Sequence, residues 1–218
     1  MTKIKFCGIT RPGDAMLAAQ IGASYAGVIF AESSRRVTPN RAAEIFDASG
    51  DVKRVGVFGH RSGAPLDLIR TSRDLALDVV QLHGRFTGPE ILQIRADLEA
   101  ELWAVISVDP QLSDIDDGWE MLADIIDALV LDTSVRGATG GTGIAFDWLR
   151  VAGIVRRISA MVPVVLAGGL HDHNVGQAIR TLHPAVVDVS SGIESSPGIK
   201  SEPLMRAFAD AVASASIV

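Results

Sequence analysis

The stretch KRVGVFGHRSGAPLDLIRTSRDLALDVVQL at residues 53–82 decides the fold. It begins with an apolar run at 53–58, continues through a helical pattern at 64–73 and ends in a second apolar run at 78–82. Short apolar runs separated by a helical segment are typical of two parallel strands joined by a crossover helix. The stretch therefore predicts one β-α-β unit of a parallel sheet.

The same alternation continues in both directions along the chain. Further strands are predicted at 3–7, 25–30, 102–107, 127–132, 163–167 and 185–190. Further helices are predicted at 13–21, 40–47, 88–97, 116–124, 147–158, 172–181 and 202–214. Eight strand–helix units fill the chain without a linker, so we expect a single α/β domain over residues 1–218, a (β/α)8 barrel. An open doubly wound sheet is the alternative, but it normally has about five or six strands.

Composition and charge exclude several classes of protein. Apolar residues make up 48% of the chain and charged residues 21%, as in a globular protein. The net charge of −6 argues against a nucleic-acid partner. No apolar run approaches the roughly 18 residues of a membrane helix, and the N-terminal residues do not resemble a secretory signal. We therefore expect a cytoplasmic protein with no membrane partner.

The single cysteine, Cys7, excludes an intrachain disulfide and a cysteine-based zinc site, and we expect no metal. Because barrel enzymes place their catalysts where strands end, Cys7 at the end of the first strand is a candidate base or nucleophile. That role would require its pKa to fall from about 8.5. A small buried apolar residue is the alternative interpretation.

Asp132 ends the sixth strand. A half-buried carboxyl group there could donate a proton, whereas a helix cap or a loop anchor is the alternative. Two more strand ends carry groups that could bind a ligand. Arg35 and Arg36 could hold a carboxylate or phosphate, or could form a solvated pair. His83, which ends the fourth strand, could bind or catalyse, or could be structural.

Glycine-bearing loops follow the last three strands. Barrels often hold a phosphate between the loops after strands seven and eight, through backbone N–H groups, although two tight turns are the alternative. We expect the ligand-binding groups of these loops to be Gly141, Gly168, Gly169, Asp188, Ser190, Ser191 and Gly192. These observations predict a barrel enzyme that acts on a phosphorylated small molecule by proton transfer.

The strand-end segments resemble the phosphoribosylanthranilate isomerase family. The matching segments are KFCGIT at 5–10, SRRVTP at 34–39, VQLHG at 80–84, LD at 131–132 with GGTG at 140–143 and FDW at 146–148, AGGL at 167–170, and DVSSGIE at 188–194. Each segment is short, but together they occur in order over essentially the whole chain. The resemblance is therefore specific.

The resemblance implies an Amadori rearrangement of N-(5′-phosphoribosyl)anthranilate, a phosphorylated amino sugar of tryptophan biosynthesis, to 1-(o-carboxyphenylamino)-1-deoxyribulose 5-phosphate. It implies that Asp132 protonates the furanose ring oxygen as general acid and that Cys7 removes the C2′ proton as general base. No cofactor is implied, because the substrate's nitrogen is the electron sink. Arg35 would contact the anthranilate moiety. The loop before it looks one residue shorter than the commonest family form, so Arg36 stays an alternative.

Two other functions compete with this one. The aminoaldose isomerase of histidine biosynthesis has an aspartate where this chain has Cys7. A catalytically silent barrel that only binds a phosphorylated metabolite would have no need of both Cys7 and Asp132. The sequence leaves a monomer and a homodimer equally open.

Overall fold

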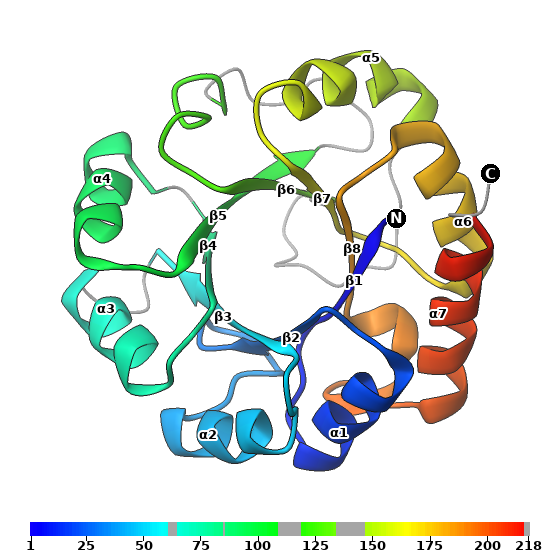
Figure 1. Ribbon diagram of the computed structural model, residues 1–218, viewed down its shortest axis with the longest axis horizontal. Helices are drawn as coiled ribbons and strands as arrows, with labels where there is room; N and C mark the ends of the chain where they lie inside the picture. The colour runs from blue at the N-terminus through cyan, green and yellow to red at the C-terminus, as the bar shows by residue number, and fades with distance from the viewer. Residues whose placement is uncertain (61–64, 85, 109–118, 134–146, 216–218) are drawn as a thin grey trace.

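Eight parallel strands close into a barrel in the computed structural model, which describes residues 1–60, 65–84, 86–108, 119–133 and 147–215 (Figure 1). Strand order follows the chain, and β1 closes the ring by pairing with β8. The strands are β1 Lys3–Phe6, β2 Tyr25–Ile29, β3 Lys53–Gly59, β4 Val79–His83, β5 Glu101–Val108, β6 Ala128–Thr133, β7 Val164–Leu166 and β8 Val186–Val189. The predicted barrel is confirmed, and the open sheet is excluded.

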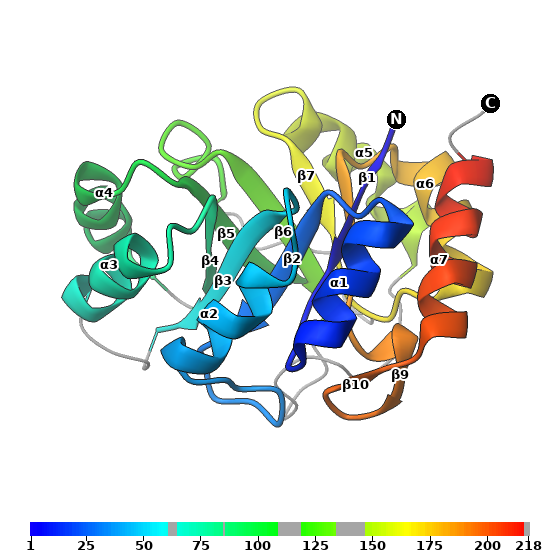
Figure 2. The same ribbon diagram turned by 60° about the horizontal axis from the view of Figure 1, so that its bottom comes forward.

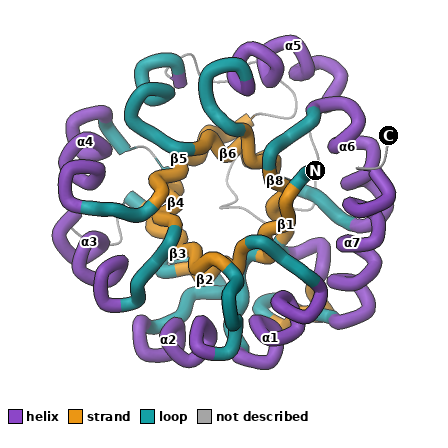
Figure 3. Tube along the Cα trace, in the orientation of Figure 1, coloured by secondary structure: helices purple, strands orange, loops and turns teal. Residues whose placement is uncertain are grey.

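Seven α-helices in the described ranges form a layer around the barrel (Figures 1 and 3). They are α1 Pro12–Ile21, α2 Pro39–Asp47, α3 Pro65–Asp74, α4 Gly88–Asp97, α5 Trp148–Ser159, α6 Asp172–Leu182 and α7 Glu202–Ala215. Three of them begin at a proline, whose missing N–H is not needed in the first turn. The carboxylate of Asp147 caps α5 by accepting hydrogen bonds from the backbone N–H groups of Leu149 and Arg150.

The helix predicted at 116–124 is wrong over the residues described there. Residues 119–125 form consecutive turns, in which the carbonyl of Trp119 accepts the N–H groups of Leu122 and Ala123. The Trp119 side chain is buried and anchors this segment to the core. Asp124 and Ile125 then oppose further helix, because short polar and β-branched side chains propagate helices poorly. Residues 116–118 lie outside the described residues.

Two apolar clusters fill the molecule, one between sheet and helices and one inside the barrel. Alternate residues of a strand point inward, so the interior cluster takes residues such as Val79, Val130 and Val186 from different strands. Tyr25 and Trp103 pack edge to face in the same cluster, with ring centroids 5.0 Å apart. The barrel is therefore a packed core, and its interior opens into a cavity at one end.

The open end lies at the carboxyl ends of the strands, opposite the N-terminus (Figure 2). The short helix Ser191–Ile193 and the antiparallel strands β9 Glu194–Ser196 and β10 Ile199–Lys200 lie at this end, between β8 and α7. They carry Glu194 and Lys200, whose side chains form an ion pair at this end of the barrel. No helix in the described ranges is long and apolar enough to cross a membrane.

Candidate active site

A cavity of about 480 Å³ occupies the mouth of the barrel. The same strand alternation that fills the core with valines places polar groups here. On β4, inward-facing Val79 is followed by Gln81 and then His83, and on β6 Val130 is followed by Asp132. The predicted residues among those that line the cavity are Cys7, Arg35, His83, Asp132, Gly168, Gly169, Asp188, Ser190 and Ser191.

Cys7 lies one residue beyond β1 and presents a free, buried thiol to this cavity. Burial raises the pKa of the thiol above its ordinary value, against the opposing effect of the nearby Lys5 ammonium group. The expected lowering of this pKa is therefore not found in the ligand-free protein. A raised pKa makes the thiolate a stronger base but a rarer one at neutral pH.

Asp132 approaches the same cavity from β6, where its side chain is partly exposed. Its strand neighbour on β5 is Ser107. Cys7 and Asp132 thus line one cavity from strands β1 and β6, which lie three positions apart around the ring. Gly141, predicted in the loop after β6, lies outside the described residues.

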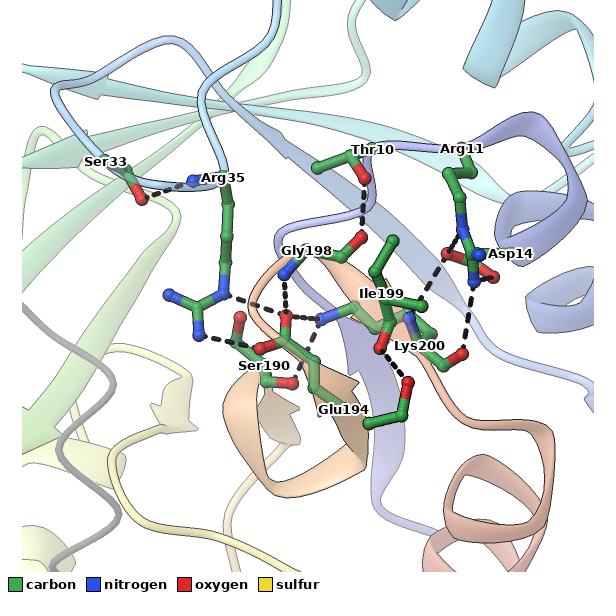
Figure 4. A network of polar contacts seen from close by, with 11 residues as sticks. Thr10, Arg11, Asp14, Ser33, Arg35, Ser190, Glu194, Gly198, Ile199 and Lys200 are labelled. Atoms are coloured by element: carbon green, nitrogen blue, oxygen red, sulfur yellow. Dashed lines mark hydrogen bonds and ion pairs between the residues drawn. The ribbon is translucent and has the colours of Figure 1, made fainter.

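Arg35 lines the cavity, whereas Arg36 is exposed and does not. The Nε and Nη2 groups of Arg35 donate to the two carboxylate oxygens of Glu194, at 2.8 and 2.7 Å (Figure 4). This pairing leaves Nη1 as the guanidinium nitrogen that Glu194 does not engage. A Cβ on Gly8 would lie 2.6 Å from Arg35 Cδ, so this glycine makes room for the arginine. The structure therefore favours Arg35 as the ligand-facing arginine.

Glu194 binds a second cation, because Lys200 Nζ donates to its Oε1 at 2.9 Å and to the Ser190 carbonyl at 3.0 Å (Figure 4). The Glu194 side chain is only 4% exposed. Burial alone would raise the pKa of this carboxyl group, but Arg35 and Lys200 outweigh burial and hold the pKa below its ordinary value. Glu194 is therefore an ionised centre that fixes two cations beside the cavity.

His83 ends β4 and faces the cavity. Burial lowers its pKa, and the positive charge of Lys5 lowers it further. The imidazole is therefore neutral near pH 7 and offers one hydrogen-bond donor and one acceptor.

The loops after β7 and β8 meet at the mouth. Gly168 and Gly169 have φ angles of 84° and 64°, a left-handed turn that glycine adopts without steric cost. A Cβ on Gly192 would lie 2.0 Å from the Leu170 carbonyl oxygen, so Gly192 lets the two loops pack together. Gly192 is absent from the cavity lining described above, and its structure-based role is loop packing.

Three groups in the cavity have unmet hydrogen-bonding capacity among the described residues: the Ser190 hydroxyl, the Oδ1 oxygen of Asp188 and the Oε1 oxygen of Gln81. The other carboxylate oxygen of Asp188, Oδ2, accepts from Lys5 Nζ at 2.6 Å. Asp188 is therefore an ion-pair partner inside the barrel as well as a cavity residue. A ligand hydroxyl or N–H could satisfy Oδ1.

Sequence reasoning missed three residues of this site, Lys5, Glu194 and Lys200. A signal existed for Lys5, because it lies two residues before Cys7 and so shares its inward face. No local pattern marks Lys200, whose partner Glu194 is fixed only when the β9–β10 turn forms.

Known proteins resemble this chain in both sequence and fold. The family model described as N-(5′-phosphoribosyl)anthranilate (PRA) isomerase matches residues 4–211. An N-(5′-phosphoribosyl)anthranilate isomerase of Paramagnetospirillum magneticum is 40% identical over 211 residues, 94% of each chain. The dimeric phosphoribosylanthranilate isomerase of Thermotoga maritima, solved as mutually generated monomers, superposes with a TM-score of 0.81 at 29% identity, covering 98% of this chain and 100% of that one.

A further solved structure contains a ligand. It is a phosphoribosyl anthranilate isomerase in complex with reduced 1-(o-carboxyphenylamino)-1-deoxyribulose 5-phosphate. That structure has a TM-score of 0.81 at 28% identity, covering 98% of this chain and 100% of that chain.

Proposed function

Because the chain belongs to the N-(5′-phosphoribosyl)anthranilate isomerase family, we propose that it catalyses the Amadori rearrangement of N-(5′-phosphoribosyl)anthranilate to 1-(o-carboxyphenylamino)-1-deoxyribulose 5-phosphate in tryptophan biosynthesis. The observation that carries the proposal is one cavity lined by a thiol, a carboxyl group and an arginine. These are a base, an acid and an anion-binding group, which this reaction needs together.

Asp132 acts first, as general acid. Its proton goes to the furanose ring oxygen while the bond between that oxygen and C1′ breaks. The lone pair of the anthranilate nitrogen forms the C1′=N bond, which gives an open-chain protonated Schiff base. The partial exposure of Asp132 at the end of β6 lets it reach a sugar bound in the cavity.

Cys7 acts second, as general base. The thiolate takes the proton from C2′, and the C–H electrons form a C1′=C2′ bond while the C=N electrons return to nitrogen. The resulting enolamine tautomerises to the ketose product. The positive charge of the Schiff base stabilises the thiolate beside it, which offsets the effect of burial on the Cys7 pKa. No metal or organic cofactor takes part, because the nitrogen is the electron sink.

Arg35 and the strand-end loops hold the two anionic ends of the substrate. Arg35 Nη1, the nitrogen that Glu194 leaves, contacts the anthranilate moiety. The phosphate lies among the backbone N–H groups of Gly168, Gly169, Ser190 and Ser191, all at the cavity. Gly192 supports the same loops, and Gly141, which lies outside the described residues, is a further substrate-binding residue of the proposal. His83 and Asp188 hydrogen-bond the sugar hydroxyls.

An acidic protein of net charge −6 can bind such an anion because the binding groups are local. Arg35 lines the cavity, and Lys5 and Lys200 bind the cavity residues Asp188 and Ser190, although Asp188 and Glu194 neutralise much of this positive charge. Oriented backbone N–H groups therefore supply much of the anion binding.

The decisive experiment is a turnover assay with freshly made N-(5′-phosphoribosyl)anthranilate, followed by loss of its fluorescence. We expect rapid decay with wild type and, for Cys7→Ser, a kcat at least about 100-fold lower, because an alcohol is a far weaker base. Turnover by Cys7→Ser near the wild-type rate would remove Cys7 as base. Turnover of the histidine-pathway aminoaldose alone would replace the substrate, and ligand binding without any turnover would indicate the silent barrel.

The remaining proposals concern organisation. We infer that residues 1–218 form one catalytic domain that works in the cytoplasm, where a biosynthetic isomerase has its substrates. A monomer and a homodimer are both compatible with the chain, and the Thermotoga maritima relative is described as dimeric. Light scattering across a concentration series distinguishes the two states.

A further inference from the structure

A buried ion pair lies beside the thiol of Cys7. The side chains of Lys5 and Asp188 are 0% and 6% exposed, and Lys5 Nζ donates to Asp188 Oδ2 at 2.6 Å. The two residues are register partners where β1 pairs with β8, at the closure of the barrel. Burying a lysine costs free energy even when it is paired, and an apolar pair of similar volume would often be as stable. Stability alone therefore does not explain these charges.

Lys5 also lies beside Cys7. Lys5 lies on β1 and Cys7 directly follows this strand, two positions further on, so the two side chains share the inward face. They pack over the bare backbone of Gly27 on β2, where an added Cβ would lie 3.2 Å from Cys7 Sγ and 3.3 Å from Lys5 Cε. The lysine side chain therefore runs alongside the thiol while its ammonium group binds Asp188.

We propose that Lys5 is a positioning residue that stabilises the thiolate of Cys7, and that Asp188 limits this effect by sharing the charge of Lys5. The proposal rests on the proposed function, in which Cys7 is the general base. A buried thiolate is costly without a nearby cation, and Lys5 is the cation that lies two positions before Cys7, on the same face and against the same Gly27 backbone.

The electrostatics of the cavity have the signs this proposal requires. Burial raises the pKa of Cys7, Lys5 opposes burial, and Asp188 acts in the same direction as burial. For Lys5, burial alone would lower the pKa, but Asp188 and Cys7 together raise it. The other charged or titratable groups that line the cavity around Cys7 are Glu32 and Arg35 after β2, His60 after β3, His83 from β4 and Asp132 from β6. Lys200 from β10 and its partner Glu194 from β9 do not line the cavity, but the charge of Lys200 also lowers the pKa of Cys7.

The test uses the fact that Cys7 is the only cysteine in the chain. The rate of its alkylation by iodoacetamide, measured against pH without substrate, gives two quantities. The midpoint reports the ionisation of the thiol, and the plateau reports its accessibility. A merely structural change alters the plateau and leaves the midpoint in place.

Lys5→Met should move the midpoint upward and slow alkylation near neutral pH by about tenfold or more, one pKa unit being a factor of ten. Asp188→Asn should move the midpoint downward, because the thiolate becomes the counter-ion of Lys5. Lys3→Met is the matched control, since it removes an exposed lysine from the same strand, and its midpoint should equal that of wild type.

Lys5→Met leaves Asp188 buried without its partner, so the double variant Lys5→Met/Asp188→Asn provides a second route. It removes both charges, and its midpoint should lie above that of wild type and below that of Lys5→Met. The proposal is overturned if the midpoint of Lys5→Met or of the double variant equals that of wild type. It is also overturned if Lys5→Met and Asp188→Asn shift the midpoint equally and in the same direction. In turnover assays the low-pH limb of kcat/KM should shift with the midpoint in Lys5→Met.

The two levels of inference fail separately. If wild type does not turn over N-(5′-phosphoribosyl)anthranilate but the alkylation midpoints move as stated, the proposed function fails and the control of Cys7 by Lys5 stands. If wild type is active and the midpoints do not move, the role of Lys5 fails and the proposed function stands.

Discussion

Replacing Glu194 by glutamine should loosen the mouth of the barrel. The substitution keeps the shape of the side chain and removes the negative charge that Arg35 and Lys200 share (Figure 4). Lys200 is 0% exposed and Arg35 14% exposed, so water can replace little of the lost interaction. Both cations are left partly buried without a carboxylate partner.

The size of the effect follows from these contacts. Removing one partner of a buried ion pair typically costs about 3–5 kcal/mol. The glutamine oxygen still accepts one hydrogen bond, and Lys200 keeps its bond to the Ser190 carbonyl, so we expect about 2–3 kcal/mol. For a chain of this size that loss lowers Tm by about 4–12 °C. KM should rise more than kcat falls, because Arg35 binds substrate and takes no part in proton transfer.

Thermal unfolding at pH 7 and steady-state kinetics measure these effects. Glu202→Gln is the matched control, because its partner Arg206 is on the surface of α7, and exposed pairs of this kind contribute about 0.3–0.5 kcal/mol. The pKa of Glu194 is lowered in the folded protein, so its stabilisation is present above the unfolded pKa of about 4.3 and is lost as pH falls through the folded pKa. Equal Tm values for Glu194→Gln and Glu202→Gln at pH 7 would refute the reasoning.

Three further predictions concern the same site. Asp132→Asn should lower kcat by about 100-fold or more with little change in substrate affinity, measured by turnover and equilibrium binding, and an unchanged kcat would remove its role as acid. In wild type, the low-pH limb of kcat should lie at lower pH than the low-pH limb of kcat/KM. The reason is that burial raises the pKa of Cys7 in the free enzyme, whereas the positively charged Schiff base lowers it in the complex. Limbs at the same pH would contradict this prediction. Gly192→Ala should lower Tm and raise KM, because its Cβ would lie 2.0 Å from the Leu170 carbonyl oxygen, and a variant with wild-type Tm would show that the loops move apart freely.

The sequence was sufficient to predict the fold and the cavity residues on the strands, because both follow from local patterns. Apolar runs located all eight strands, and Cys7, His83 and Asp132 lie at or within one residue of the carboxyl ends of β1, β4 and β6, as expected. The helix at 116–124 was mispredicted because burial of Trp119 and the Asp124–Ile125 pair stop the helical turn.

The ion pairs could not be predicted, because they join distant parts of the chain. Lys5 and Asp188 are 183 residues apart in sequence, and Arg35 and Glu194 are 159 apart. Only the register of β1 against β8 makes the first pair neighbours, and barrel closure is needed to set that register. Local periodicity contains no information about such a pairing.

The pairing of β1 with β8 also orders events during synthesis. The strand β1 is synthesised long before β8, its neighbour at the closure of the barrel. At about 5–20 residues per second, the 183 residues from Lys5 to Asp188 take roughly 10–40 s. Throughout that interval Lys5 lacks Asp188, its partner in the finished protein, and one edge of β1 lacks the strand β8 that pairs with it. In ribosome-stalled chains that end before β8, Cys7 should therefore be alkylated with a pH midpoint different from that of the finished protein. The reactive thiol is made among the first residues, but its chemical environment is completed among the last.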